Sequence, residues 1–220
     1  SDLFIGLMSG TSLDGVDAVL ARFADQPALG GRAAIDVLAH AHTDMPADLR
    51  EALWRLNQPG DDELHRAALA ANALARVQAG AVQDVLRSAG LTGAEVRAIG
   101  SHGQTVRHRP GEFDGVGYTV QLNQPALLAE LCGIDVVCDF HSRDVAAGGQ
   151  GAPLVPAFHA TVFSLPDRPR AILNLGGIAN LTLLPAVLSP AGVIRGFDCG
   201  PGNALLDHWV AKHQGQVFDA

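Results

Sequence analysis

The 220-residue chain has almost no lysine, because Lys212 is the only one in the sequence. This scarcity excludes two common ways of binding a nucleotide. A P-loop needs a lysine directly after its glycines, and a protein-kinase lobe needs a lysine on a strand. Any phosphate group must therefore be bound by backbone amides, hydroxyl groups, arginine or a metal ion.

Basic charge and cysteine are also scarce. Lysine and arginine together number 15 against 23 acidic residues, which gives a formal net charge of −8. A nucleic-acid-binding surface would need a basic stripe, so we expect no nucleic-acid partner. The three cysteines are odd in number and lack the paired spacing of metal ligands, which predicts buried free thiols in a reducing compartment. They are Cys132, Cys138 and Cys199.

No stretch has the pattern of a membrane-spanning helix. Residues 145–166 and 171–194 lack charge, but both contain interior glycine and proline, which predicts buried structure of a soluble protein instead. The N-terminus shows no signal-peptide pattern. We therefore expect a cytoplasmic protein without a membrane partner.

Strand and helix patterns alternate along the chain. A long helix is expected from the cap residue Asp61 to Gly90, with Leu64 on its apolar face. Crossovers of this kind imply some parallel strands, so the sequence predicts an α/β fold. Further strands are expected at 33–42, 96–100, 118–122, 134–140 and 193–197, and further helices at 48–57, 125–132, 153–163 and 203–213.

The opening segment, 4–23, is the most informative part of the chain. An apolar run stops at Ser9-Gly10-Thr11-Ser12, passes Asp14-Gly15 and resumes, which predicts two strands joined by a tight turn. Glycine lets the backbone approach a ligand, and amides with hydroxyl groups form an anion site. Asp14 and Asp17 are then placed to face a hydrated Mg²⁺. The alternative is an ordinary hairpin with a hydrophilic turn.

A second segment, 171–184, repeats this design. Asn174 and Gly176-Gly177 stand at a bend between two apolar strands. Two such units suggest duplicated lobes that each offer a phosphate-binding hairpin. The pairing resembles the way in which the actin, Hsp70 and sugar-kinase superfamily binds ATP between its lobes.

Two polar segments follow predicted strands, where open α/β sheets often bind ligands. In 100–108, the side chains of His102, Gln104 and Arg107 suit sugar hydroxyl, amide or carboxylate groups, although His102 and His108 can also form a simple loop pair. A zinc site made of these two histidines and His141 is disfavoured by its spacing.

The segment 139–144 leads into a glycine-rich loop at 147–153. Arg143 can bind a carboxylate through two hydrogen bonds, and Asp144 can orient it or bind a hydroxyl group. The alternative is a surface ion pair of little energy. The long glycine loop favours a site, because such loops in compact domains are often functional.

The segment 196–203 holds the sharpest candidate for catalysis. Asp198 ends a predicted strand, just before a helix that begins near Asn203. A carboxylate there can accept a proton from an attacking hydroxyl group or water, and helix amides can bind phosphate oxygens. The alternative is that Asp198 only caps the helix or shapes a turn.

Five motifs together resemble the anhydro-N-acetylmuramic acid kinase family of the sugar-kinase/Hsp70/actin superfamily. They occur in the family's order, and the resemblance extends from residue 3 to about residue 209. The five motifs are 8–17, 100–105, 148–156, 174–177 and 196–203.

The resemblance implies an α/β fold of actin-like ATPase (ribonuclease H-like) lobes, with mixed sheets and flanking helices. The expected first lobe is 1–135, and the second begins at 136–220. Chains of the family are longer, so we expect a truncated second lobe. We also expect weak or no activity from these residues alone.

The implied activity is an unusual phosphotransfer. The enzyme opens 1,6-anhydro-N-acetylmuramic acid with water and phosphorylates the freed O6 from ATP, with Mg²⁺, during peptidoglycan recycling. The products are N-acetylmuramate 6-phosphate and ADP. The family also tends to form dimers, so a homodimer is expected.

The resemblance also implies roles for individual residues. Asp198 matches the catalytic base, and His102, Gln104, Arg143 and Asp144 fall in segments that should line the sugar pocket. Asp14 is also the first candidate to face Mg²⁺ beside the ATP phosphates. The implied nucleotide residues are Gly10, Thr11, Ser12, Leu13, Asp14, Gly15, Val16, Asp17, Asn174, Gly176, Gly177, Gly200 and Asn203.

Two other classes of protein stay open. A nucleotide-binding ATPase or sensor of the same superfamily would hydrolyse ATP without a sugar. A glycosidase would use Asp198 and Asp144 as paired carboxylates and need no ATP. Neither class explains two phosphate hairpins together with polar loops suited to a sugar.

Overall fold

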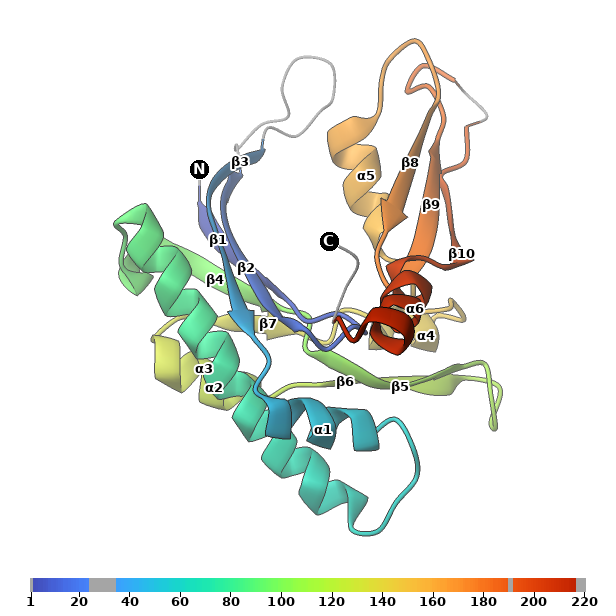
Figure 1. Ribbon diagram of the computed structural model, residues 1–220. Coiled ribbons are helices and arrows are strands. Elements are labelled where there is room, and N and C mark those ends of the chain that lie inside the picture. Colours follow the sequence, from blue (N-terminus) through green and yellow to red (C-terminus); the bar gives the residue numbers. More distant parts are fainter. Residues whose placement is uncertain (1, 24–34, 190–191, 217–220) are drawn as a thin grey trace. The chain divides into compact units, whose positions relative to one another are not determined.

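The computed structural model describes residues 2–23, 35–189 and 192–216 (Figure 1). These residues form two compact units. The first contains the described residues up to Gly151, and the second contains those from Ala152 onward.

The first unit is built on a five-stranded sheet in the order β3-β2-β1-β4-β7. Strands β1, β4 and β7 are parallel, whereas β2 and β3 run antiparallel beside them. The sheet is therefore mixed, as expected. Its strands are β1 (Leu3–Met8), β2 (Gly15–Phe23), β3 (Ile35–Asp44), β4 (Val96–Ser101) and β7 (Val136–Cys138).

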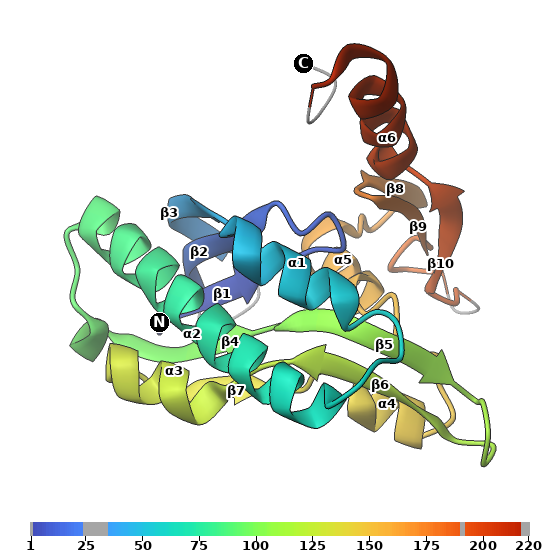
Figure 2. The ribbon, with the colours of Figure 1, turned by 60° about the horizontal axis from the view of Figure 1, so that its bottom comes forward.

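Helices cover this sheet and close its core. The long helix α2 packs against β2, β3 and α3, and Figure 2 shows α3 beside it. Fully buried side chains such as Ile5, Leu74 and Ile99 meet in this core. Each contributes about 1.5–3 kcal/mol to folding. The helices are α1 (Ala47–Arg55), α2 (Glu63–Ala89) and α3 (Pro125–Cys132), with a 3-10 turn at Gly93–Glu95.

The expected long helix is present but differs at its start. It begins at Glu63, and its cap residue is Asp62 rather than Asp61. Leu64 is 89% exposed, so the expectation that it lies on the apolar face is wrong. Residue 64 lies in the first turn, before the part of the helix that covers the sheet.

Two elements of the first unit differ from the expected pattern. Strand β5 (Gln104–Pro110) pairs with β6 (Gly117–Leu122), although only β6 was expected. The expected strand at 134–140 is shorter, because Asp139 adopts φ of 59° and ends β7. Helix α4 (Ser142–Ala146) follows directly.

The units divide later in the chain than expected. Strand β7 pairs with β4 through Ile99 and Val136, so this strand belongs to the sheet of the first unit. The division lies after Gly151, not after residue 135.

The second unit is a three-stranded antiparallel sheet, in the order β10-β9-β8, with two helices. Helix α5 packs closely against β10, because a Cβ atom on Gly196 would lie 2.2 Å from Cγ of Pro156. The elements are α5 (Val155–Phe163), β8 (Arg170–Leu175), β9 (Ile178–Leu184), β10 (Arg195–Pro201) and α6 (Asn203–Gln214).

Much apolar surface of this unit faces solvent. Leu184 and Ala179 are buried, but Leu173, Leu175 and Trp209 are 56%, 68% and 59% exposed. The expected burial of 171–194 is therefore only partly found. A three-stranded sheet with two helices has too few elements to cover both of its faces.

The thiols and the helices of the described residues differ in how they meet the expectations from sequence. All three cysteines are free thiols, but Cys132 and Cys138 are half-buried and Cys199 is exposed, so the expectation of buried thiols is wrong. Burial raises the pKa of Cys132 and of Cys138, where the charge of Asp139 adds to it. None of the described helices is long and apolar enough to cross a membrane.

A substitution at Gly15 tests the packing of β2 against β3. A Cβ atom there would lie 2.5 Å from both the carbonyl oxygen of Thr43 and Nε2 of His42. We expect Gly15→Ala to lower the free energy of unfolding by about 1–3 kcal/mol, measured by urea denaturation. As a control, Gly80→Ala should raise it by up to about 1 kcal/mol, because Gly80 lies in α2 with no atom within 4 Å of its Cβ position. Equal stability of Gly15→Ala and the unchanged chain would contradict this packing.

Candidate functional site

Three loops of the first unit meet at one edge of its sheet. They follow the parallel strands β1, β4 and β7, whose register aligns Leu7 with Ser101 and Ser101 with Cys138. The carboxyl ends of parallel strands are where open α/β sheets bind ligands. The structure thus brings together segments that are far apart in the sequence.

The first loop forms the expected turn between β1 and β2. The carboxylate of Asp14 accepts hydrogen bonds from Oγ of Ser12 at 2.7 Å and from the N–H of Gly15 at 3.0 Å. The N–H of Leu13 donates to the carbonyl of Gly10 at 3.2 Å. Thr11, Ser12 and Asp14 remain exposed and available to a ligand.

Two of the predicted nucleotide residues are part of the core. Leu13 is 4% exposed and Val16 is fully buried, and both belong to the hydrophobic cluster of the first unit. Only their backbone groups are therefore available to a ligand. Their contribution to the site is to fix the turn through packing.

Asp17 is held by two histidines that the sequence reasoning missed. Its Oδ1 contacts Nε2 of His40 at 3.1 Å and Nδ1 of His42 at 3.0 Å. The hydrogen bond with Asp17 raises the pKa of His42. The signal was present, because His40 and His42 alternate on one face of a strand, but it needed the pairing of β3 with β2. Within the described parts of the chain, no group of three His, Cys, Asp or Glu side chains is arranged to hold a metal ion.

Gln104 joins the second loop to the first. Its side chain is almost fully buried, Oε1 accepts a hydrogen bond from Oγ of Ser9, and Nε2 donates to the carbonyl of Gly10 at 3.1 Å. Both ends of the amide are thus used within the protein. A direct contact of Gln104 with a sugar stays a prediction and would require it to exchange a partner.

His102 pairs with His141, not with His108. The Nε2 atoms of His102 and His141 lie 2.9 Å apart, and Nδ1 of His141 contacts the carbonyl of Gly151. His108 instead contacts Oγ1 of Thr119 at 3.0 Å. The expected alternative of a His102–His108 pair is therefore wrong, because β5 places the two rings with different partners.

Helix α4 carries Arg143 and Asp144, for which we expected either a ligand site or a surface ion pair between the two. The carboxylate of Asp144 accepts a hydrogen bond from the N–H of Gly151 at 2.7 Å, so it ties the glycine loop to the helix. Arg143 is exposed and forms no ion pair among the described residues. The surface Arg143–Asp144 pair is thus not found, and the guanidinium group of Arg143 is free to bind an anion.

Arg107 has a structural partner outside these loops. Its Nη2 donates to Oε1 of Glu63 at 2.6 Å, and only 15% of the arginine side chain is exposed. This pair connects β5 to the start of α2. The guanidinium group of Arg107 is therefore occupied by Glu63, which lies outside the loops that carry the other candidates.

In the second unit the expected hairpin and helix meet through their backbones. The N–H groups of Gly202 and Asn203 donate to the carbonyls of Gly177 and Gly176, both at 2.9 Å. A Cβ atom on Gly202 would lie 2.2 Å from the carbonyl oxygen of Gly176, so only glycine permits this approach. Asn174, Gly200 and Asn203 are thereby gathered around one turn.

This contact changes which helix amides are available. The first four N–H groups of a helix have no partner within the helix. Those of Gly202 and Asn203 are occupied by the hairpin, so the amide of Leu205 remains as a donor among the described residues. The expected anion site of α6 therefore begins after Asn203, whose N–H is already used.

Asp198 lies within β10 and is exposed. The cap residue of α6 is Gly202, without a side-chain hydrogen bond, so Asp198 does not cap this helix. It pairs in register with Asn180, which pairs in turn with Asn174. Directly opposite residues share one face of a sheet. Three polar side chains thus form a row across the strands, next to the glycine turn.

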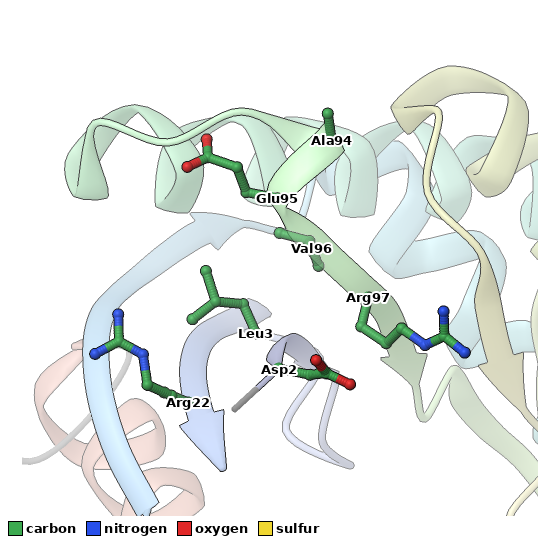
Figure 3. A pocket seen from close by; sticks show the side chains of 7 residues that line it. All are labelled: Asp2, Leu3, Arg22, Ala94, Glu95, Val96 and Arg97. Atoms are coloured by element: carbon green, nitrogen blue, oxygen red, sulfur yellow. The ribbon is translucent and has the colours of Figure 1, made fainter. Parts of the chain in front are cut away.

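A pocket of about 580 Å³ in the first unit lies elsewhere (Figure 3). It is formed where Leu3 and Val96 begin β1 and β4, at the opposite end of these strands from the three loops. Figure 3 shows Arg22 and Arg97 on opposite sides of it, so its charges do not converge on one point. None of the predicted site residues lines this pocket, which is bordered by Asp2, Leu3, Arg22, Ala94, Glu95, Val96 and Arg97.

A mixed α/β sheet with polar loops at its carboxyl edge, followed by a second glycine-turn hairpin, makes this an α/β protein of two units with a candidate site at the edge of its first sheet. The family model of anhydro-N-acetylmuramic acid kinase matches residues 2–220. The chain therefore belongs to the anhydro-N-acetylmuramic acid kinase family.

Curated relatives agree with this assignment. An anhydro-N-acetylmuramic acid kinase of Variovorax paradoxus (strain S110) is 63% identical over 219 residues, which are 99% of this chain and 56% of the relative. One of Cupriavidus metallidurans is 60% identical over 220 residues, 100% of this chain and 56% of the relative. The chain thus spans about half the length of the curated relatives that it matches.

Similarity to solved structures is weaker. A ROK hexokinase from Thermus thermophilus has a TM-score of 0.38 at 15% identity, covering 84% of this chain and 47% of that one. A reductive activator for a corrinoid, iron-sulfur protein has a TM-score of 0.45 at 12% identity, covering 91% and 31%. Both scores are too low to indicate more than a partial overlap.

The Asp17–His42 contact predicts a pH dependence of stability. Because the fold raises the pKa of His42 above the ordinary value of histidine, about 6.5, protonated His42 stabilises the folded chain below that pH. This contribution is lost as the pH rises through the pKa of His42 in the fold. We expect Asp17→Asn to lower the pKa of His42 and to flatten this dependence, measured by NMR titration and by urea denaturation.

Asp44→Asn is the control for this prediction. Asp44 lies 3.5 Å from Nε2 of His42 and contributes less to its raised pKa than Asp17 does. The control should therefore lower the pKa of His42 by a smaller amount. An unchanged pKa of His42 in Asp17→Asn would contradict the contact.

Proposed function

We propose that the protein containing this chain is a kinase for 1,6-anhydro-N-acetylmuramic acid in peptidoglycan recycling. It opens the anhydro bridge with water and phosphorylates O6 from ATP, giving N-acetylmuramate 6-phosphate and ADP. Family membership supports this proposal. The structural observation that carries it is an exposed carboxylate, Asp198, on the strand beside a glycine-turn hairpin.

Asp198 is proposed as the base. It accepts a proton from water while the water oxygen forms a bond to the anomeric carbon and the bond from that carbon to O6 breaks. O6 then takes the γ-phosphoryl group, and the bond to the β-phosphate oxygen breaks to release ADP. The exposed position of Asp198 supports this role, because its carboxylate is not occupied by helix capping.

Each unit offers groups that are suited to the phosphate groups of a nucleotide. In the first unit, exposed Thr11, Ser12 and Asp14 offer hydroxyl and carboxylate oxygens. In the second unit, the amide of Leu205 is a donor for a phosphate oxygen. Oxygen donors of this kind suit Mg²⁺, which would neutralise charge on the phosphate groups when bound.

The sugar would be bound by the loops that follow β4 and β7. Arg143 is the candidate for the lactyl carboxylate, because its guanidinium group is free. Gln104 and Asp144 support the loops through their contacts with Gly10 and Gly151. A cytoplasmic location and a homodimer stay predictions of the family resemblance.

Product analysis tests the proposed function. We would incubate ATP and the anhydro sugar with the 220-residue chain, and with a chimera that continues it with the remaining part of the Variovorax paradoxus relative. The chimera should add one water and one phosphoryl group to the sugar, detected by mass spectrometry. The 220-residue chain should show little or no turnover, because Leu173 and Trp209 leave the second unit partly uncovered.

The other outcomes are also informative. Rapid product formation by the 220-residue chain would contradict the expectation that these residues alone turn over little or no substrate. Release of ADP without sugar would support an ATPase in place of the kinase. Opened but unphosphorylated sugar without ATP would support a glycosidase.

Substitution of Asp198 tests its role in the chimera. Because an amide does not accept the proton, Asp198→Asn should lower kcat by about 10²–10⁴-fold, a typical range for general base catalysis. Binding of ATP and sugar, measured by calorimetry, should stay nearly unchanged. Asp167→Asn, on an exposed loop of the same unit, should leave kcat unchanged. Full activity of Asp198→Asn would refute the assignment.

A further inference from the structure

The rings of His102 and His141 form a continuous chain of hydrogen bonds between two carbonyl groups. Nδ1 of His102 lies 2.8 Å from the carbonyl oxygen of Gly103, and the two Nε2 atoms lie 2.9 Å apart. Nδ1 of His141 contacts the carbonyl oxygen of Gly151. The rings meet edge to face at 86° with centroids 4.9 Å apart. All four ring nitrogens therefore have a partner.

The partners determine how many protons the two rings hold. A carbonyl oxygen only accepts hydrogen bonds, so each Nδ1 must carry a proton to make its contact. The contact between the two Nε2 atoms requires one more proton between them. Three protons on four nitrogens are one more than two neutral imidazoles hold. With every contact made, the pair carries one positive charge.

We propose that His102 and His141 act as one proton-sharing pair with a single positive charge, which helps to bind an anionic sugar. His141 is then a positioning residue, because it is buried and acts through His102, whose ring is only partly buried. The pair stands after β4 and β7, at the same edge of the sheet as the first loop. The choice of a carboxylate-bearing sugar as ligand rests on the proposed function.

The two carbonyl groups are fixed by glycine. Gly103 and Gly151 both adopt φ of 73°, a conformation that favours glycine. A Cβ atom would lie 2.5 Å from the carbonyl oxygen of Leu122 at Gly103, and 2.8 Å from Cγ2 of Val145 at Gly151. The acceptors at both ends of the chain of hydrogen bonds are thus held in place by the backbone.

The pair has no negative partner among the described residues. Nearby, Asp144 binds the N–H of Gly151, Asp139 binds Oγ of Ser142, and His108 stands beyond Gly151, but none of them contacts either ring. Burial lowers the pKa of His102, and so does the charge of His141, while the Gly103 carbonyl raises it. A bound carboxylate would supply the missing negative charge and favour the protonated pair.

Loss of the shared proton has a structural consequence. With only two protons, one of the three contacts loses its hydrogen, and a ring nitrogen then faces an oxygen or nitrogen lone pair. The loop that carries His102 is therefore held most firmly when the pair is charged. Binding of an anionic sugar should take up a proton and weaken as the pH rises.

NMR of the 220-residue chain labelled with ¹⁵N-histidine tests the pair without any need for activity. We expect scalar coupling between the two Nε2 nuclei across their hydrogen bond, and a proton on both Nδ1 atoms at acidic pH. His141→Asn should abolish the coupling, since asparagine can still donate to Gly151 but lacks the Nε2 group. His108→Asn should leave the coupling intact. Absence of coupling in the unchanged chain, or two independently titrating rings, would overturn the proposal.

Kinetics of the chimera test the role in binding. His141→Asn should raise KM for the anhydro sugar acid by about tenfold. The ratio of this KM to that of the unchanged chimera should fall toward one as the pH rises. KM for ATP and kcat should stay nearly unchanged. A matched sugar without the lactyl carboxylate, 1,6-anhydro-N-acetylglucosamine, should show no such effect on its binding. Equal losses for both sugars would refute the role in binding an anion.

The two experiments separate failure of this proposal from failure of the proposed function. If the unchanged chimera has no sugar-dependent kinase activity, the proposed function fails, and so does the choice of ligand. The coupling between the histidines would still show whether the pair shares a proton. If the kinase is active but the coupling is absent, only the histidine proposal fails.

Discussion

Parallel pairing of β1, β4 and β7 is the constraint on which the candidate site of the first unit depends. It places three loops at one edge of the sheet, and the loops must then satisfy the polar groups that they bury against one another. Gln104 binds the first loop, and the N–H of His102 donates to the carbonyl of Leu7 at 3.1 Å. His102 and His141 connect the second loop to the third. The loops thus form one connected structure, not three independent ligand-binding segments.

This connection divides the polar residues into two groups with different roles. Gln104, Asp144 and His141 use their hydrogen-bonding groups within the protein, and so they fix the loops. Thr11 and Arg143 are exposed and can bind a ligand directly. A substitution in the first group should act on the ligand indirectly, through a loop or a neighbouring side chain, and one in the second group should remove a direct contact. Residue type alone does not separate the groups, because both contain amide, hydroxyl or charged side chains.

The parts that were predictable from sequence depend on local signals. The glycine-containing turns predicted both hairpins. The turn before the last helix pattern predicted that α6 starts at Asn203, as it does. Contacts that depend on strand register were missed, such as those of Asp17 with His42 and of His102 with His141. The same holds for strand β5, whose sequence alternates weakly and which is stabilised by pairing with β6. Pairing between distant segments decides these features, and a single sequence does not display it.

The second unit shows why chemistry and positioning must be judged separately. The glycine turn, Asp198 and the free amide of Leu205 are all in place within it. Yet Leu175 is 68% exposed on the sheet that carries Asp198, so this sheet gains less from burial than the core of the first unit does. Catalysis by a base requires its carboxylate to be held within a fraction of an ångström of the productive position. Poor support of Asp198 would therefore lower the turnover of this chain, and added chain that covers the sheet should raise kcat by holding the carboxylate in place.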